Sequence, residues 1–150
     1  MRRRNGLVLA SLWIASGAHF AWAQAPRDME TGNPACPRAE AVTDLHLYGL
    51  WQATLEGVPG TATLRLGKNA NHDESVSGTL ERDGQRALVA GDVDQGDFTL
   101  EESGDGKTIA ATWTGRIVEA SCGKEIRGTW TLDTGQVTHP FVLRKSPGWQ

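Results

Sequence analysis

The sequence predicts an all-β protein, an eight-stranded antiparallel up-and-down barrel with a short N-terminal helix or extended lead-in. From Gly49 onward, eight segments alternate apolar and polar residues, the pattern of half-buried strands. The connections between them are mostly short and rich in Gly, Asp and Asn, which is typical of hairpins. Glycines recur inside the strands, where they permit sharp bends or close backbone approach.

Each expected strand pairs antiparallel with the next one, because the connections have hairpin length. Glycines spaced 13 residues apart, from Gly78 to Gly91 and from Gly115 to Gly128, suit the corners of a closed barrel. The alternative is an open sandwich, but closure removes both exposed edges. The expected strands are Gly49–Glu56, Thr61–Gly67, Ser75–Arg82, Arg86–Val93, Asp97–Glu102, Thr108–Val118, Lys124–Asp133 and His139–Arg144.

The alternation also assigns an inward face to each strand. Three tryptophans, Trp51, Trp113 and Trp130, fall on that face beside many small residues. Ile109 is expected to face inward with Trp113, on the same strand. An eight-stranded barrel either is filled by its side chains or holds one small ligand. The tryptophans therefore either fill the barrel or line a cavity, and the sequence leaves both possibilities open.

The N-terminus has the three parts of a secretory signal peptide. Arg2–Arg4 is positively charged, Gly6–Phe20 is apolar but shorter than a membrane span, and Ala21–Ala23 is a small-x-small cleavage site. We expect a periplasmic or secreted protein with no membrane span after cleavage. The predicted organisation is a signal peptide at 1–23, a disulfide-tethered lead-in at 24–47, the barrel at 48–146 and a tail at 147–150.

Composition excludes several classes of protein. The leader carries three of the 15 Lys and Arg and none of the 18 Asp and Glu, so the mature chain has a net charge of −6. A chain this acidic, without a basic cluster outside the leader, is a poor nucleic-acid binder. Its 150 residues are too few for a TIM barrel or a full Rossmann enzyme.

Cys36 and Cys122 are the two cysteines of the chain. Export to an oxidising compartment favours a disulfide between them. A metal site would need His or carboxylate ligands at suitable spacing, and neither cysteine has them nearby. The disulfide would tie the lead-in to the barrel, and a short helix between Arg38 and Leu47 would then plug one end of it.

No catalytic or metal-binding constellation is evident, so we predict a non-enzymatic protein with no cofactor and no metal. Nucleophile-elbow, HExxH and phosphate-loop motifs are missing from the sequence. His72–Glu74 lies in a polar loop, and Asp92–Asp97 lacks the glycine and distal glutamate of a calcium loop. Glu101 and Glu102 are neighbours on a strand, so they point to opposite faces and do not converge on one substrate.

Several stretches resemble the avidin/streptavidin family of small β-barrels. Ala110–Val118 and Glu125–Asp133 resemble its sixth and seventh strands, Gly49–Trp51 its first and Ser77–Leu80 its third. The resemblance spans about Gly49 to Arg144 in the same order. It implies a barrel with a cavity at one end. It further implies that the tryptophan at position 130 forms a wall of the ligand site, with that at 113 close by.

The polar half of that family's biotin site is missing. The corresponding positions carry Ala53, Leu80, Arg82, Ile109 and Ala111, and the closing-strand aspartate has no counterpart. Each buried polar group of biotin left without a partner would cost roughly 1–3 kcal/mol. The resemblance therefore predicts the architecture and not biotin as the ligand.

These observations predict an exported, non-enzymatic β-barrel that binds a small, largely apolar molecule against Trp51, Trp113 and Trp130. The alternative is a protein-interaction module, such as an inhibitor of an envelope hydrolase or an immunity factor. Its contact surface would then be the acidic loops Lys68–Glu74 and Asp94–Asp97. The partner is an unknown small molecule or an envelope protein, and the oligomeric state is not fixed by the sequence.

Overall fold

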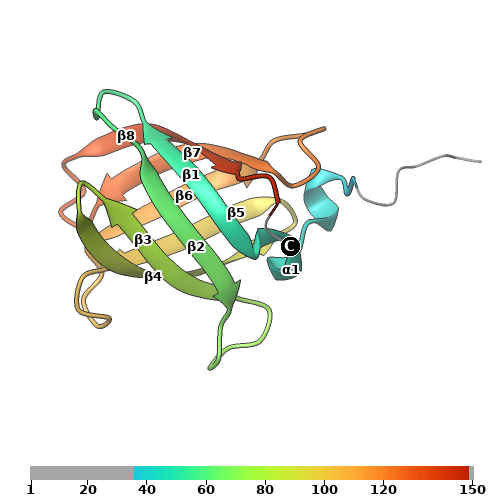
Figure 1. The fold of residues 1–150 in the computed structure, drawn as a ribbon, viewed down its shortest axis with the longest axis horizontal. Helices are drawn as coiled ribbons and strands as arrows, with labels where there is room; N and C mark the ends of the chain where they lie inside the picture. The colour runs from blue at the N-terminus through green and yellow to red at the C-terminus, as the bar shows by residue number, and fades with distance from the viewer. Residues whose placement is uncertain (1–35, 149–150) are drawn as a thin grey trace, which may run out of the picture. The chain divides into compact units, whose positions relative to one another are not determined.

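The computed structural model describes residues 36–148. The predicted signal peptide, the first part of the lead-in and Trp149 lie outside the described residues. Two short helices precede eight strands (Figure 1). The elements are the 3-10 helix η1 (Ala39–Ala41), the helix α1 (Asp44–Leu47) and the strands β1 (Gly49–Leu55), β2 (Ala62–Lys68), β3 (Val76–Arg82), β4 (Gln85–Asp94), β5 (Asp97–Ser103), β6 (Ala111–Ile117), β7 (Glu125–Leu132) and β8 (Thr138–Lys145).

The eight strands form one closed antiparallel barrel, which confirms the predicted fold class. Each strand pairs with the next, and β8 closes the barrel on β1 with Ala53 opposite Leu143. On the adjoining pair β6 and β7, Trp113 lies directly opposite Trp130. Inward-facing apolar side chains from all eight strands make a single core. Closure leaves no strand of the barrel with an unpaired edge.

Two tight turns show how the sequence sets the register. Asp83–Gly84 joins β3 to β4 and Gln95–Gly96 joins β4 to β5, and all four residues have positive φ. Two consecutive residues with positive φ are the requirement of a type I′ hairpin turn, whose twist matches that of the flanking strands. The pairings Arg82 opposite Gln85 and Asp94 opposite Asp97 follow from these two-residue loops.

Glycines inside the strands mark close backbone approaches, as the sequence predicted. A Cβ on Gly78 would overlap the carbonyl oxygen of Arg65 on β2, and one on Gly128 would overlap that of Thr114 on β6. Neither site has room for a side chain, so these glycines allow neighbouring strands to bend tightly around the barrel.

The lead-in covers one barrel end, which we call the α1 end (Figure 1). Leu47 is fully buried, and its carbonyl accepts a hydrogen bond of 2.8 Å from Trp51 Nε1. Lys145 Nζ donates to the carbonyl of His46 at 2.7 Å and lies above the Trp51 ring. Burial is the main cause that lowers the pKa of Lys145. The helix thus plugs this end of the barrel, as expected.

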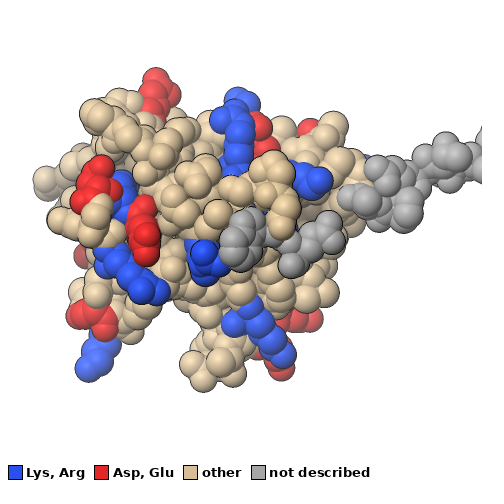
Figure 2. Space-filling view, in the orientation of Figure 1, with Lys and Arg blue, Asp and Glu red and all other residues tan. Residues whose placement is uncertain are grey.

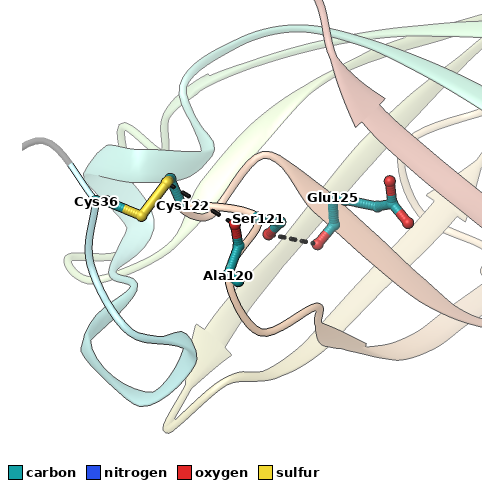
Figure 3. Close-up of a disulfide and its surroundings, with 5 residues drawn as sticks. All are labelled: Cys36, Ala120, Ser121, Cys122 and Glu125. Carbon is teal, nitrogen blue, oxygen red and sulfur yellow. Dashed lines mark hydrogen bonds between the residues drawn. A yellow bond between two sulfur atoms is a disulfide. The ribbon is translucent and has the colours of Figure 1, made fainter.

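The predicted disulfide is present between Cys36 and Cys122 (Figure 3). It joins the start of the described lead-in to the loop between β6 and β7, which also belongs to the α1 end. Two further contacts fix the same segment: Gly96 lies against Ala39, and Gly123 lies against Val42. The covalent bond and these contacts together hold η1 and α1 over the barrel. A disulfide is compatible with an oxidising compartment.

One part of the strand prediction is wrong. The sixth strand was expected to begin at Thr108, with Ile109 facing the core, but β6 begins at Ala111. Ile109 instead lies in the loop between β5 and β6 with 38 % of its surface exposed. Asp105 holds that loop in a compact turn by accepting hydrogen bonds from the backbone N–H groups of Lys107 and Thr108. These local bonds replace the strand pairing that would have turned Ile109 inward.

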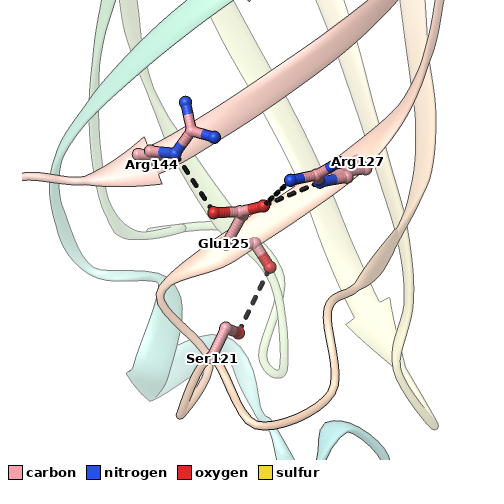
Figure 4. A network of polar contacts seen from close by, with 4 residues as sticks. All are labelled: Ser121, Glu125, Arg127 and Arg144. Carbon is pink, nitrogen blue, oxygen red and sulfur yellow. Dashed lines mark hydrogen bonds and ion pairs between the residues drawn. The ribbon is translucent and has the colours of Figure 1, made fainter.

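Charged side chains of both signs are interspersed on the face shown in Figure 2. One network at the α1 end joins Glu125 to Arg127 and Arg144, at 2.6 and 3.1 Å (Figure 4). The hydrogen bond from Arg127 is the main reason that the pKa of Glu125 lies below its ordinary value, and Arg144 acts in the same direction. These pairs are largely exposed, so they cross-link β7 and β8 with little net stabilisation.

Among residues 36–148, no helix has the length and apolar character needed to cross a bilayer.

Candidate functional site

The barrel end opposite the α1 end, which we call the mouth, contains a buried carboxylate. The mouth is formed by the strand ends and by the loops 56–61, 83–84, 104–110 and 133–137. Glu102 lies near the end of β5 with only 7 % of its surface exposed. A charged side chain is almost never buried to this degree unless hydrogen bonds or an ion pair compensate its lost hydration.

Three donors from three other strands compensate Glu102. Its Oε2 accepts hydrogen bonds from the indole Nε1 atoms of Trp113 and Trp130, at 3.3 and 3.2 Å. Its Oε1 lies 3.4 Å from Nη2 of Arg82 on β3. The carboxylate therefore connects β5 with β3, β6 and β7, of which β3 and β7 are not its neighbours in the sheet.

Side chains are stacked on Trp130, the outermost indole of the mouth. The guanidinium carbon of Arg82 lies 5.3 Å from the centre of the Trp130 ring, within the range of a cation–π interaction. The His139 ring is 5.9 Å away and tilted by 33°, and its Nδ1 lies 2.9 Å from the carbonyl oxygen of Glu56. Arg82 thus contacts Trp130 with its charged face and Glu102 with one edge.

The structure divides the three predicted ligand-binding tryptophans between the two ends of the barrel. Trp113 and Trp130 meet at Glu102 near the mouth, and Trp113 also packs edge-on against Phe141 at 5.0 Å. Trp51 belongs to the α1 end, where its indole N–H donates a hydrogen bond to the carbonyl oxygen of Leu47. All three are buried, and Trp130 retains 8 % exposure. Trp130 is therefore the most accessible of the three, although none of them lines the cavity described next.

A small cavity of about 210 Å³ opens beside this cluster. Apolar and polar groups both reach it. Leu80 supplies an apolar wall, and both Arg82 and Glu102 line the same space. The remaining lining consists of Gln85, Arg86, Ala87, Gly104 and Ala110. Small or apolar residues thus make up half of the lining and polar or charged residues the other half, and small-molecule sites are usually more apolar and larger than this.

A wider depression lies elsewhere, on the outer face of β3, β4 and β5, with a volume of about 600 Å³. We call it the outer groove. Leu88, which is 49 % exposed, and Ile109 are its large apolar residues, and the loop residues 69–72 form one rim. It holds neither the buried carboxylate nor any of the three tryptophans. The mouth, and not this larger groove, therefore combines a cavity with organised polar chemistry.

The other titratable residues named from the sequence are placed as follows. Between residues 36 and 148, no three His, Cys, Asp or Glu side chains are placed to hold a metal ion. Glu101 is exposed while Glu102 is buried, so the two carboxylates point to opposite faces as the alternation predicted. All buried side-chain N and O atoms within this described range have hydrogen-bond partners.

Glu102 is the residue that sequence reasoning missed. From the sequence it was considered only as a catalytic partner of Glu101, although it continues the inward alternation of Phe98 and Leu100 on the same strand. A charged residue at an inward position of a barrel strand is the signal that identifies it.

Comparisons with known proteins add little to this description. No family model matches the chain, and no curated protein matches it. Among solved structures it is similar to a redesigned β-barrel, with 14 % sequence identity over 69 % of this chain and 95 % of that one, at a TM-score of 0.44. The eight-stranded barrel is thus established by the strand pairing, and membership of the avidin/streptavidin family stays a prediction.

Proposed function

We propose that the protein is an exported, non-enzymatic β-barrel that binds a small, largely apolar ligand in the cavity at its mouth. The single observation that supports this most strongly is Glu102, buried among two indoles and Arg82 beside that cavity. A buried ion pair is often less stabilising than apolar residues of similar volume. Its presence at the rim of a cavity, where an apolar side chain would complete the core, favours a role in binding.

The size and lining of the cavity support a small ligand. A space of about 210 Å³ suits a molecule of a few carbon atoms or one ring, and Leu80, Ala87 and Ala110 offer it apolar surface. The tryptophans named from the sequence then divide their roles. Trp130 and Trp113 do not line the cavity but hold its carboxylate, Glu102, in place, and Trp51 supports the core at the α1 end. Export is part of the proposal, and the signal peptide predicted from the sequence and the disulfide support it.

The indole N–H resonances of the full mature chain provide the test, because each tryptophan reports its own position. Ligands of matched size, offered as acids, amides and amines, are titrated while these resonances are followed by NMR. We expect those of Trp130 and Trp113 to shift and that of Trp51 to stay in place. Shifts confined to Trp51, or no shift with any compound, would overturn the proposal.

A pair of matched variants tests the location. Ala87 lines the mouth cavity, whereas Ala90 on the same strand lines the outer groove. Ala87→Leu fills the cavity, so we expect at least tenfold weaker binding. Ala90→Leu makes the same change outside the barrel. This variant should bind the ligand with the same affinity as the unmodified protein. Equal losses in both variants would contradict a site at the mouth.

The second candidate function is the protein-interaction module, which the outer groove favours. Its rim includes residues 69–72 of the polar loop named from the sequence, and Leu88 is exposed within it. Inhibition of a purified envelope hydrolase by the unmodified chain, lost in Leu88→Glu and kept in Ala87→Leu, would favour this function over ligand binding. If both variants inhibited the hydrolase, or if neither did, the result would contradict an interaction surface in the outer groove.

A further inference from the structure

Arg82 is held in position from two sides. Glu102 accepts a hydrogen bond from its Nη2, and the Trp130 ring lies below its guanidinium. The Arg82 side chain is only 23 % exposed. An arginine fixed in this way loses less conformational freedom when it binds a ligand than a mobile one does. Glu102 and Trp130 therefore act as positioning residues for the guanidinium.

Most of the donors of Arg82 remain available for a ligand. A guanidinium carries five N–H donors, and the described residues supply Arg82 with one hydrogen bond, to Glu102. The side chains of Gln85 and Arg86 line the same cavity and add further donors. The cavity thus presents an excess of N–H groups on its polar side.

The carboxylate oxygens of Glu102, by contrast, are already in use. Trp113 and Trp130 both donate to one oxygen of Glu102, and Arg82 donates to the other. An external cation would have to displace Arg82, which is tethered beside Glu102 at a high effective concentration. The two arginines in the lining also outnumber its single carboxylate. The site is therefore better suited to a ligand that accepts hydrogen bonds and carries negative charge.

We infer that the ligand of the mouth cavity is a small carboxylic acid, bound as its carboxylate. This inference rests on the proposed function and specifies its ligand class. The planar carboxylate pairs with the free edge of the Arg82 guanidinium, a geometry that arginine favours. The hydrocarbon part of the acid lies against Leu80, Ala87 and Ala110.

The test compares matched trios of acid, amide and amine: butyrate, hexanoate and benzoate, each with its amide and its amine analogue. Affinities for the full mature chain are measured by calorimetry. At least one acid is expected to bind ten times or more tightly than its amide and than its amine. Equal binding of acids and amides in every trio would overturn the inference and leave the proposed function standing. No binding by any compound would overturn both.

Variants assign the preference to Arg82. Arg82→Gln combined with Glu102→Gln removes the ion pair without leaving either charge buried alone. The ratio of the affinity for an acid to the affinity for its amide should then fall towards one. Arg82→Lys keeps a positive charge beside Glu102 but loses the planar pair of donors, so it should lower the ratio even if the double variant folds poorly. Arg116→Gln makes the same arginine change in the exposed pair with Asp97 at the α1 end, so it should keep the full ratio. An unchanged ratio in the first two variants would contradict the role of Arg82.

Discussion

Glu102 Oε2 lies 3.2 Å from the indole nitrogen of Trp130, although β5 and β7 are separated in the sheet by β6. This hydrogen bond crosses the interior of the barrel near its mouth. Trp113, on the intervening strand, donates to the same oxygen at 3.3 Å. One carboxylate thus fixes two aromatic side chains, and through Arg82 it also fixes the polar edge of the neighbouring cavity.

The first prediction concerns this carboxylate. Glu102→Leu leaves two buried indole N–H groups without an acceptor, and each such group costs roughly 1–3 kcal/mol. We expect the free energy of unfolding to fall by about 2–5 kcal/mol, measured by urea denaturation. Glu102→Gln keeps an acceptor oxygen, so its free energy of unfolding should fall by less. Glu101→Leu, on the exposed face of the same strand, is the control and should change stability by about 0.5 kcal/mol or less.

The second prediction concerns the disulfide. Cys36 and Cys122 are 86 residues apart, and the chain-entropy model assigns a loop of this length about 4–5 kcal/mol. Cys36→Ser with Cys122→Ser should lower the free energy of unfolding by a comparable amount. Release of the lead-in should also expose Trp51 and shift its emission to longer wavelength. Unchanged stability and emission would mean that the contacts of η1 and α1 hold the plug without the covalent bond.

The third prediction concerns the in-strand glycines. An alanine Cβ at position 128 would overlap the backbone of β6, which has no flexible end to move aside. Gly128→Ala should therefore cost about 3 kcal/mol or more, or prevent folding. Gly67→Ala is the matched control, since nothing lies within 4 Å of a Cβ at that position. Thermal unfolding of both variants distinguishes a close approach from an incidental glycine.

The fourth prediction concerns pH. Backbone hydrogen bonds from Thr108, and then from Lys107, hold the pKa of Asp105 well below its usual range. Because the folded-state pKa is the lower one, the stabilisation is complete above the unfolded value of about 4 and is lost as the pH falls through the folded value. Asp105→Asn should therefore flatten the acid side of a plot of unfolding midpoint against pH.

Asp133→Asn, at an exposed loop position of the mouth, is the control for this measurement and should leave the acid limb unchanged. A parallel acid limb in Asp105→Asn and the unmodified protein would show that the carboxylate of Asp105 does not stabilise the loop 104–110.

Local patterns were sufficient to predict most of the barrel. Alternation placed Trp51, Trp113 and Trp130 inside, and the short connection expected between Arg82 and Arg86 contains the observed two-residue turn at Asp83–Gly84. The failure at Ile109 has a local cause as well, because Asp105 supplies backbone N–H groups with a partner before strand pairing begins. An apolar residue that continues an alternating pattern does not show where the pairing ends.

The candidate site was less accessible to prediction. The sequence named Trp113 and Trp130 but grouped them with Trp51, which the structure places at the α1 end. Arg82 and Glu102 are 20 residues apart, and Glu102 and Trp130 are 28 apart. Their convergence depends on the stagger of the strands around the closed barrel, which no local pattern specifies.

By itself, the order of residues determined the eight strands apart from the start of the sixth, most of the inward-facing side chains and the pairing of the two cysteines, because periodicity, turn chemistry and cysteine count are properties of the chain. Only the tertiary structure decided that a single buried carboxylate accepts hydrogen bonds from two indoles and a guanidinium beside a cavity. That arrangement depends on distances between strands remote in the sequence, which are fixed only when β8 closes on β1.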